Sequence, residues 1–293
     1  MVQSDATARK YVKNDTQRSF AAALHYTPKR RGDPDDRQAR RDRGPMSDSP
    51  WSEPSTVAGF ARSSPNDTLL RVAAGERRAS ARLLDIGCGA GRNLLPLAHA
   101  GWEAIGTDFS LPMLTAAAAR VADARLANRV WLLRATMDQL PFAPAAFDFI
   151  IAHGIWNLAR SGGEFRHAVR EAARVARPGC ALFVFTFSRH TLSDTAQPLP
   201  GESFVFTQFS GQPQCFLTEE QLVSELGACG FEPDGSLPIR ELNRPPKGAL
   251  RTSAAPVIYE GLFRRESLAS SGRERRSAPS EERNTERHHT DPE

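Results

Sequence analysis

The chain has 293 residues, of which 40% are hydrophobic and 25% charged, so it can bury a sizeable core in one large domain or two small ones. No apolar run approaches the roughly 18 residues that cross a bilayer, and residues 1–9 lack the apolar core of a signal peptide. These absences argue against a membrane-spanning or secreted protein and predict a cytoplasmic one. The net charge of +4 comes from arginines interleaved with acids, without a continuous cationic stripe, which argues against a nucleic-acid partner.

Composition divides the chain into three parts. Residues 1–50 are rich in Arg, Asp, Ser, Pro and Gly, and residues 266–293 in Ser, Arg and Glu, so neither segment can bury enough apolar surface to offset its ordering entropy. We predict a disordered N-terminal extension over 1–50, a folded domain over 51–265 and a disordered C-terminal tail over 266–293. The four cysteines show neither a C-x-x-C pair nor metal-ligand spacing, so no metal site is predicted.

The central part alternates between strand and helix signals, which is typical of an α/β domain with a parallel sheet. Ser110 and Thr218 stand where they can cap the N-termini of the helices that follow them. Pro178 and Gly179 end the third helix. In chain order, the expected elements are strand 82–86, helix 92–100, strand 102–106, helix 111–122, strands 130–134 and 147–152, helix 164–176, strand 181–187, helix 219–228 and strands near 239–242 and 257–263.

The most informative stretch is Leu-Leu-Asp-Ile-Gly-Cys-Gly-Ala-Gly-Arg-Asn at residues 83–93. A strand that ends in glycines and feeds a helix presents free main-chain N–H groups to a ligand, and glycine lets that ligand approach the backbone closely. A dinucleotide fingerprint, G-x-G-x-x-G, would need its third glycine at residue 92, which is arginine. Instead Gly87, Gly89 and Gly91 alternate with other residues, and Asp85 precedes the first of them by two positions.

Acidic residues also follow the second and third strands. Asp108 ends the second strand, where a carboxylate can accept hydrogen bonds from both ribose hydroxyls of a nucleoside that lies across the glycine turn. An NAD-dependent enzyme would use the same acid, so Asp108 indicates an adenosine cofactor without choosing between the two classes. Met137 and Asp138 follow the third strand, where the carboxylate can accept from an adenine amine and a backbone N–H can donate to a ring nitrogen.

Together these features resemble class I S-adenosylmethionine-dependent methyltransferases, in particular their small-molecule branch. The resemblance rests on the acid and glycines of residues 85–91, on Asp108, on the Asp-x-Leu-Pro-Phe stretch of residues 138–142 and on the helix that ends at Pro178-Gly179, and it covers about residues 51–265. It implies a Rossmann-like, doubly wound α/β fold with a seven-stranded, mostly parallel sheet and an antiparallel edge strand. It also implies S-adenosyl-L-methionine as the cofactor, with these cofactor-binding residues: Asp85, Gly87, Gly89, Gly91, Asp108, Met137, Asp138 and His153.

Methyl transfer from a sulfonium is an in-line displacement at carbon, so positioning matters more than acid–base chemistry. A soft nucleophile needs no base, whereas a phenol or an amine needs a proton acceptor. The end of the fourth strand offers three weak catalytic candidates, His153, Trp156 and Asn157. His153 could be a base or a wall of the cofactor site, and Trp156 could cover the cofactor or belong to the core.

The sequence predicts a compact acceptor that is largely apolar or a soft nucleophile. The fourth strand leads neither into Asn/Asp-Pro-Pro-Tyr/Phe, the motif of amino methylation, nor into the Pro-Cys of cytosine methylation. The aromatic segment 204–216 is either a lid that excludes water from the acceptor or an ordered loop packed on the domain. Residues 51–75 are a second lid candidate, and Arg189 and His190 could meet an anionic acceptor.

Two functions of other classes stay open on these residues. One is a nicotinamide-dependent oxidoreductase, which Arg92 at the third glycine position disfavours. The other is a non-catalytic module that binds S-adenosylmethionine; the intact acids and glycines argue against a degenerate cofactor site but do not establish turnover. The oligomeric state is not predicted.

Overall fold

The computed structural model describes residues 50–244 and 255–266. The two segments predicted to be disordered, 1–50 and 266–293, lie outside the described residues except for their boundary residues 50 and 266, and their disorder stays a prediction. Within the described ranges, no helix has both the length and the apolar character that crossing a bilayer would need.

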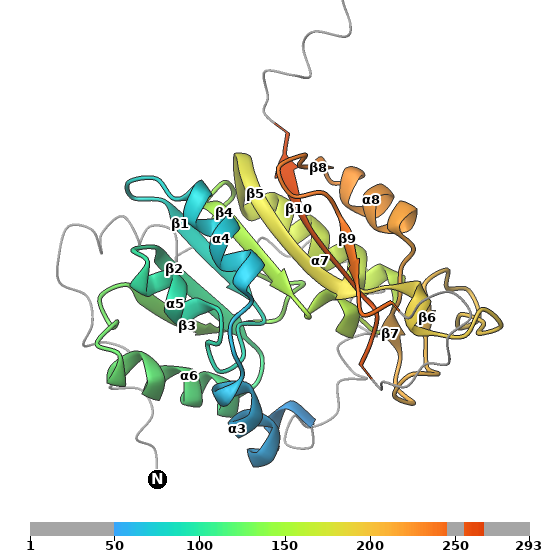
Figure 1. Cartoon of the computed structure of the whole chain (residues 1–293), viewed down its shortest axis with the longest axis horizontal. Coiled ribbons are helices and arrows are strands. Elements are labelled where there is room, and N and C mark those ends of the chain that lie inside the picture. The colour runs from blue at the N-terminus through green and yellow to red at the C-terminus, as the bar shows by residue number, and fades with distance from the viewer. Residues whose placement is uncertain (1–49, 245–254, 267–293) are drawn as a thin grey trace, which may run out of the picture.

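The centre of the fold is an eight-stranded mixed sheet in the order β3-β2-β1-β4-β5-β10-β8, with β9 pairing β10 beside that path (Figure 1). Strands β1 to β5 are parallel to one another, and β10 runs antiparallel to β5 and pairs antiparallel with β8 and β9. The predicted mostly parallel sheet with an antiparallel edge is therefore confirmed. The strands are β1 (Arg82–Ile86), β2 (Glu103–Asp108), β3 (Val130–Arg134), β4 (Phe147–His153), β5 (Ala176–Phe187), β8 (Phe231–Pro233), β9 (Arg240–Leu242) and β10 (Ile258–Arg265).

Helices cover both faces of this sheet, as the resemblance implied. One face carries α4 (Asp67–Glu76), α5 (Leu94–His99) and α6 (Leu111–Asp123), and the other carries α7 (Gly162–Val175) and α8 (Glu219–Gly227) (Figure 1). Successive strand residues serve opposite layers, because side chains alternate along a strand: Leu83 packs in the first layer and Leu84 in the second. Strands buried on both faces need near-continuous apolar sequence, which β1 and β4 have.

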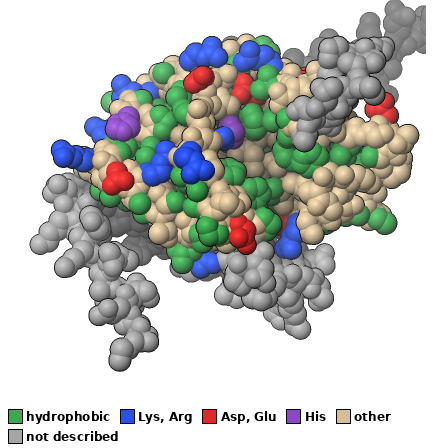
Figure 2. Space-filling model, turned by 60° about the horizontal axis from the view of Figure 1, so that its bottom comes forward, with side chains coloured by type: hydrophobic (Ala, Val, Ile, Leu, Met, Phe, Trp, Pro, Cys, Tyr) green, Lys and Arg blue, Asp and Glu red, His purple; other side chains and the backbone are tan. Residues whose placement is uncertain are grey.

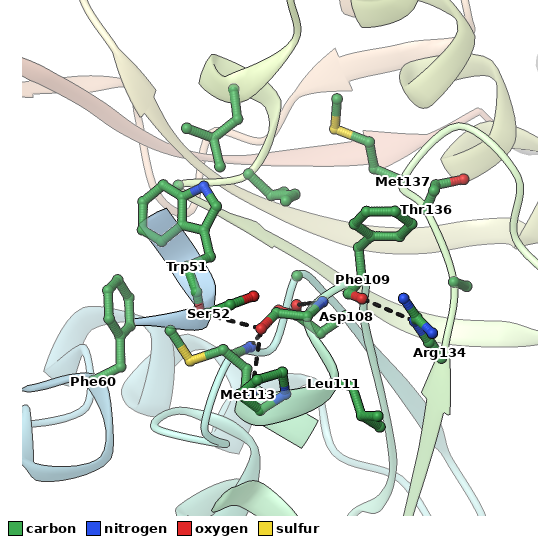
Figure 3. A pocket seen from close by; sticks show the side chains of 18 of the residues that line it. Trp51, Ser52, Phe60, Asp108, Phe109, Leu111, Met113, Arg134, Thr136 and Met137 are labelled. Carbon is green, nitrogen blue, oxygen red and sulfur yellow. Dashed lines mark hydrogen bonds between the residues drawn. The ribbon is translucent and has the colours of Figure 1, made fainter. Parts of the chain in front are cut away.

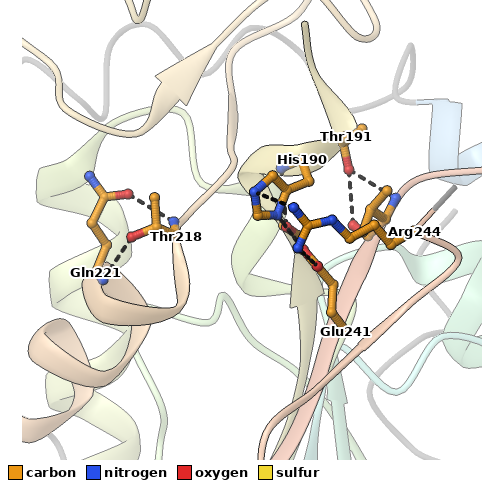
Figure 4. A network of polar contacts seen from close by, with 8 residues as sticks. His190, Thr191, Thr218, Gln221, Glu241 and Arg244 are labelled. Atoms are coloured by element: carbon orange, nitrogen blue, oxygen red, sulfur yellow. Dashed lines mark hydrogen bonds and ion pairs between the residues drawn. The ribbon is translucent and has the colours of Figure 1, made fainter. Parts of the chain in front are cut away.

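Local chemistry explains where the helices begin. The Ser110 hydroxyl accepts from the Met113 N–H at the start of α6, which confirms the predicted cap. Thr218 caps α8 in a reciprocal arrangement, because its hydroxyl accepts from the Gln221 N–H while the Gln221 amide oxygen accepts from the Thr218 N–H (Figure 4). The other helical elements among the described residues are α3 (Pro54–Arg62) and three short 3-10 turns, η2 (Pro50–Ser52), η3 (Trp156–Leu158) and η4 (Arg189–Thr191).

The predicted elements differ from the structure mainly at their ends. β2 extends to Asp108 because that residue still pairs with Arg134 of β3. α5 is shorter than expected, and β5 begins at Ala176, which pairs with Phe147 before a register irregularity. The predicted count of seven strands is too low for the main sheet, because the three-residue β8 was not expected; a separate hairpin, β6 (Val205–Phe206) and β7 (Gln214–Cys215), was not expected either.

Strand order reverses between β1 and β4, since the chain goes from β1 outward to β2 and β3 and then returns to β4 and β5. At such a reversal, the loops that leave the carboxyl ends of neighbouring strands diverge and open a crevice, which is where open α/β sheets bind ligands. The fold therefore places the candidate site at the ends of β1, β2, β3 and β4.

Candidate active site

A cavity of about 880 Å³ lies at the carboxyl ends of these four strands (Figure 3). Figure 2 views the end of the molecule on which α3 lies and shows apolar side chains gathered near the centre of that face. Each strand contributes the residues that directly follow it, so segments far apart in the sequence line one hollow. The contributions used below are Gly87 and Gly89 after β1, Asp108 at the end of β2 with Phe109 after it, Met137 and Asp138 after β3, and His153 at the end of β4 with Gly154 and Ile155 after it.

The glycine turn after β1 is folded tightly against the end of β2. The N–H groups of Gly87 and Cys88 both donate to the Thr107 carbonyl, at 2.8 and 2.9 Å. Gly87 has a φ of +71°, and a Cβ placed on it would lie 2.7 Å from the side chain of Ile155, so a larger residue would be strained and would clash with the cavity wall. Gly91 packs behind the turn against Leu95 and does not line the cavity, so its cofactor-binding role stays a prediction without a direct contact.

Asp108 lines the cavity and also fastens the turn. Its Oδ2 accepts from the Gly89 N–H and its Oδ1 accepts from the Ser110 N–H, both at 2.8 Å. Burial raises the pKa of this carboxyl above its usual value, while the N–H groups of Ser110, Gly89 and Phe109 oppose the rise. The carboxylate is thus held rigidly at the end of β2, with further lone pairs able to accept hydroxyl donors from a ligand in the cavity.

Asp85 lies behind the cavity wall, not on it. Its side chain is buried, with the residue 2% exposed, and burial raises its pKa to about 7, which the nearby Arg92 cation opposes and the Asp108 carboxylate reinforces. Arg92 extends from the end of the turn, where its Nη2 lies 3.1 Å from His153 Nδ1. The arginine that breaks the dinucleotide fingerprint therefore sits between a buried acid and the histidine that follows β4.

His153 lines the cavity but is a poor proton acceptor. Burial and the Arg92 cation lower its pKa to about 3, so the imidazole is neutral across the physiological range and binds a proton only weakly. The ring stacks on Phe185 with centroids 4.0 Å apart, and its Nε2 lies 3.2 Å from the Asn66 Nδ2. Of the two roles considered for His153, a wall of the site agrees with this environment and a general base does not.

Trp156 and Asn157 do not face the cavity, contrary to their candidacy as catalytic residues. The chain enters the 3-10 turn η3 directly after the cavity-lining Ile155, and this turn directs both side chains into the layer under α7. Trp156 is 1% exposed and packs edge-to-face on Phe165 of α7, with ring centroids 6.1 Å apart, and Asn157 is 2% exposed. Trp156 is thus a core residue.

The lid candidate at residues 51–75 contributes the outer wall of the cavity through Trp51, Ser52 and Phe60 (Figure 3). The rings of Trp51 and Phe60 meet edge-to-face with centroids 5.8 Å apart. The Ser110 hydroxyl donates to the Trp51 carbonyl at 3.1 Å, which ties η2 to the start of α6. The rest of that candidate, α4, packs on the sheet.

The other lid candidate, the aromatic segment 204–216, packs away from the cavity. Phe204 is 1% exposed and Phe206 is buried, and both form ring pairs within the domain, with Phe165 and Phe216 respectively. None of the described residues of this segment lines the cavity, so the ordered-loop interpretation holds and the lid interpretation is wrong.

Arg189 and His190 do not reach the cavity either. His190 Nδ1 lies 2.6 Å from Glu241 Oε1, and Arg244 contacts both His190 Nε2, at 3.2 Å, and Glu241 Oε2, at 2.9 Å (Figure 4). Arg189 donates to two backbone carbonyls of the following loop. This network joins η4 to β9 and serves the antiparallel edge of the sheet.

Several cavity residues carried no signal in the sequence. Phe109 and Leu111 flank the cap of α6, Arg134 ends β3 with its guanidinium 5.4 Å from the centroid of Phe109, and Leu158 ends η3. All four lie at or near the carboxyl end of a strand, so the general rule that ligands bind there predicts their neighbourhood but not the individual side chains.

Comparison with known proteins shows what the segment that holds this site is similar to. Residues 83–179, which hold the glycine turn, Asp108, Met137, Asp138 and His153, match the family described as a methyltransferase domain. A demethylmenaquinone methyltransferase of Lactiplantibacillus plantarum is 39% identical over 108 residues, 36% of this chain and 44% of that protein. A ubiquinone biosynthesis O-methyltransferase of Azorhizobium caulinodans is 29% identical over 154 residues, 52% of this chain and 58% of that protein.

The chain thus spans about half the length of these two curated relatives. Among solved structures, the 1,6-didemethyltoxoflavin-N1-methyltransferase of Burkholderia thailandensis, determined with S-adenosylhomocysteine, superposes with a TM-score of 0.52. The superposition covers 85% of this chain and 87% of that one at 18% identity, a likeness that concerns the fold alone.

Proposed function

We propose that the chain is a class I S-adenosylmethionine-dependent methyltransferase that transfers the methyl group of S-adenosylmethionine to a small-molecule acceptor; the match of residues 83–179 to a methyltransferase domain supports this. The observation that carries this proposal is a single cavity that joins the glycine turn and Asp108 to an apolar wall formed by Trp51 and Phe60. Its volume of about 880 Å³ lies in the upper part of the roughly 300–1,000 Å³ typical of small-molecule sites, which suits a cofactor together with an acceptor.

The residues at the strand ends fit S-adenosylmethionine. Gly89 lines the cavity, and a Cβ on it would project to within 3.7 Å of Phe60, so the absence of a side chain lets the cofactor approach the backbone there. The carboxylate of Asp108 can accept from the ribose hydroxyls. Met137 and Asp138 line the cavity and are suited to the adenine edge. Asp85 is buried behind the turn, so its role at the amino-acid end, which the resemblance implies, would be exerted from behind the cavity wall. When bound, the sulfonium supplies an electrophilic methyl group.

The protein contributes alignment and exclusion of water. Trp51 and Phe60 cover the cavity, and a dry, ordered site lets the nucleophile approach the methyl carbon in line with the departing sulfur. Because the pKa of His153 is lowered to about 3, this histidine does not withdraw the proton of a phenol or an amine at neutral pH. An acceptor that reacts as a soft nucleophile or as an already ionised group would need no base from His153.

The cavity wall favours a flat, apolar acceptor. Trp51, Phe60, Ile155 and Leu158 supply aromatic and aliphatic surface to it. The two curated relatives are named for menaquinone and ubiquinone biosynthesis, which supports an aromatic, quinone-like ring as the acceptor. The predictions of no nucleic-acid partner and of a cytoplasmic location stand unchanged.

Methyl-transfer assays with labelled donor test the proposal. The purified protein would be offered panels of hydroquinones, phenols, small thiols, chalcogen anions, nucleic acids and proteins. We expect label on one of the small acceptors, with hydroquinones or acidic phenols as the best substrates. Label on DNA, RNA or protein and on none of the small acceptors would refute it, as would binding of NAD in place of S-adenosylhomocysteine.

We also propose that residues 51–265 form the complete cofactor-binding unit. The cavity is lined from Trp51 to Glu164, and the sheet closes with β10, which ends at Arg265. A chain shortened to these residues is expected to fold and to bind S-adenosylhomocysteine as the full chain does; insolubility of the shortened chain alone would contradict this boundary.

A further inference from the structure

A second hollow, of about 450 Å³, is lined by residues of α7 and residues at the end of α8. These two helices cover the opposite face of the sheet from α4, α5 and α6 (Figure 1). Its floor is made of small residues, Ala173 from α7 and Ala228 and Cys229 from the end of α8. Four arginines surround it, three from α7 and one from the end of β10: Arg166, Arg170, Arg174 and Arg265. It shares no lining residue with the cavity of the candidate active site.

The arginines of α7 recur every fourth residue, so they project from one flank of the helix. An ordinary solvated helix face would show such charges as freely moving side chains. Here the two outer arginines are fixed instead: Arg166 makes a bidentate pair with Glu225, at 2.8 and 2.6 Å, and Arg174 binds Glu171 and two backbone carbonyls. The guanidinium of Arg170 stands between these fixed groups.

Arg170 and Arg265 each have guanidinium N–H groups that donate to no residue in the described ranges. Arg170 makes no hydrogen bond and no ion pair with any residue that the structure describes. Arg265 uses only Nη1, which donates to the Cys229 and Gly230 carbonyls, so its Nε and Nη2 keep their protons for a ligand. Arg170, Arg265 and Cys229 line the same hollow, and both cations oppose the rise that burial causes in the pKa of the Cys229 thiol, while Glu225 reinforces that rise.

The charges in and beside the hollow do not balance. The lining holds four arginines and one carboxylate, Glu225, which pairs with Arg166. Glu171 pairs with Arg174, and Glu202 acts on Arg166. Guanidinium groups present paired N–H donors that match the oxygen spacing of phosphate and carboxylate. A compact oxyanion would neutralise the excess charge at Arg170 and Arg265 and satisfy their remaining donors.

We propose that the hollow between α7 and α8 is a binding site for a compact phosphate-type oxyanion, gripped by Arg170 and Arg265. The cationic side chains surround a single hollow with small floor residues, so the site fits one or two phosphate groups and not an extended polyanion. Free phosphate, diphosphate and the phosphate groups of a phosphorylated small molecule share the required chemistry.

Calorimetric titration of the full chain with inorganic phosphate and with inorganic diphosphate, at constant ionic strength, tests this site. We expect one diphosphate per chain, bound more tightly than phosphate. Arg170→Ala should weaken diphosphate binding roughly tenfold or more, because charge-assisted hydrogen bonds are lost. Arg78→Ala, at an exposed arginine outside the hollow, is the matched control and should leave the affinity unchanged.

Binding of S-adenosylhomocysteine, measured on the same samples, reports whether the protein is folded and whether the first cavity binds its ligand. The anion proposal can therefore fail while the proposed methyl transfer stands, and the methyl-transfer proposal can fail while the anion site stands. A wild-type protein that binds neither anion, or equal diphosphate affinity in wild type and Arg170→Ala, would overturn the proposal. So would an oligonucleotide that binds through Arg170 and that diphosphate does not displace. A phosphorylated small molecule that competes with diphosphate would support it.

Discussion

Replacement of the buried acid below the glycine turn, Asp85→Asn, should make the cofactor-free protein more stable at alkaline pH. The pKa of this carboxyl is about 7 in the folded chain and 3.8 in the unfolded reference. Between these values the folded state binds the proton more tightly than the unfolded state, so the contribution of Asp85 to folding stability falls as pH rises through this window and is fully lost above about pH 7. Asparagine cannot ionise and removes that loss.

The magnitude follows from the part of the shift that lies above pH 5. About two pKa units separate pH 5 from the folded pKa of about 7, and each is worth about 1.36 kcal/mol, so the wild type should lose about 3 kcal/mol relative to Asp85→Asn between pH 5 and pH 8. Urea unfolding of both proteins at the two pH values measures this difference directly. The exposed Asp123→Asn, at the end of α6, is the control and should follow the wild type.

Cofactor binding gives a second readout of the same residue. An ammonium group bound near Asp85 favours its ionised form, so wild-type protein at pH 7 should release about half a proton when S-adenosylhomocysteine binds, and Asp85→Asn none. Calorimetry in two buffers of different ionisation enthalpy reports this number. Parallel stability curves for wild type and variant, together with equal proton release, would refute the reasoning.

Three further results are expected. Asp108→Ala should weaken S-adenosylhomocysteine binding by roughly 1–3 kcal/mol, and far more than Asp123→Ala, because a fixed charged acceptor is lost; equal affinities by calorimetry would reduce Asp108 to a helix-terminal acid. His153→Gln should change the level of kcat but not its pH profile between about pH 5 and 8, because the pKa of His153 is about 3. If the variant's pH profile lacked an ionisation near neutrality that the wild type shows, His153 would be a general base after all. Phe204→Ala should lower the free energy of unfolding by roughly 3–5 kcal/mol and leave the acceptor KM unchanged, since the ring is buried away from the cavity; a selective rise in KM would return that segment to the site.

The sequence was most informative where one short pattern determines one structure. The strands 82–86 and 130–134 have the predicted bounds, because each is a short apolar run bounded by polar or charged residues. Asp108 could be placed at the site from sequence because the carboxyl ends of parallel strands meet at one edge of a sheet. The Ser110 cap could also be predicted from the sequence, since a serine directly before a segment with helical apolar periodicity marks a helix N-cap.

The direction in which individual side chains point could not be predicted from the sequence in the same way. Ile155 lines the cavity and the next residue, Trp156, is in the core, and this reversal depends on a 3-10 turn that has no sequence pattern of its own. The three-residue β8 was missed because two of its residues are exposed and one is proline, so no alternation marks it. Arg92 was seen only as a departure from another motif, because its position between Asp85 and His153 depends on contacts distant in sequence.

The most direct test of the central claim is a calorimetric titration of the full chain with S-adenosylhomocysteine and, separately, with NAD. Because the cavity joins the glycine turn to Asp108, both within a segment that matches a methyltransferase domain, we predict one S-adenosylhomocysteine bound per chain, weakened in Asp108→Ala, and no binding of NAD. Binding of NAD without binding of S-adenosylhomocysteine would contradict the account.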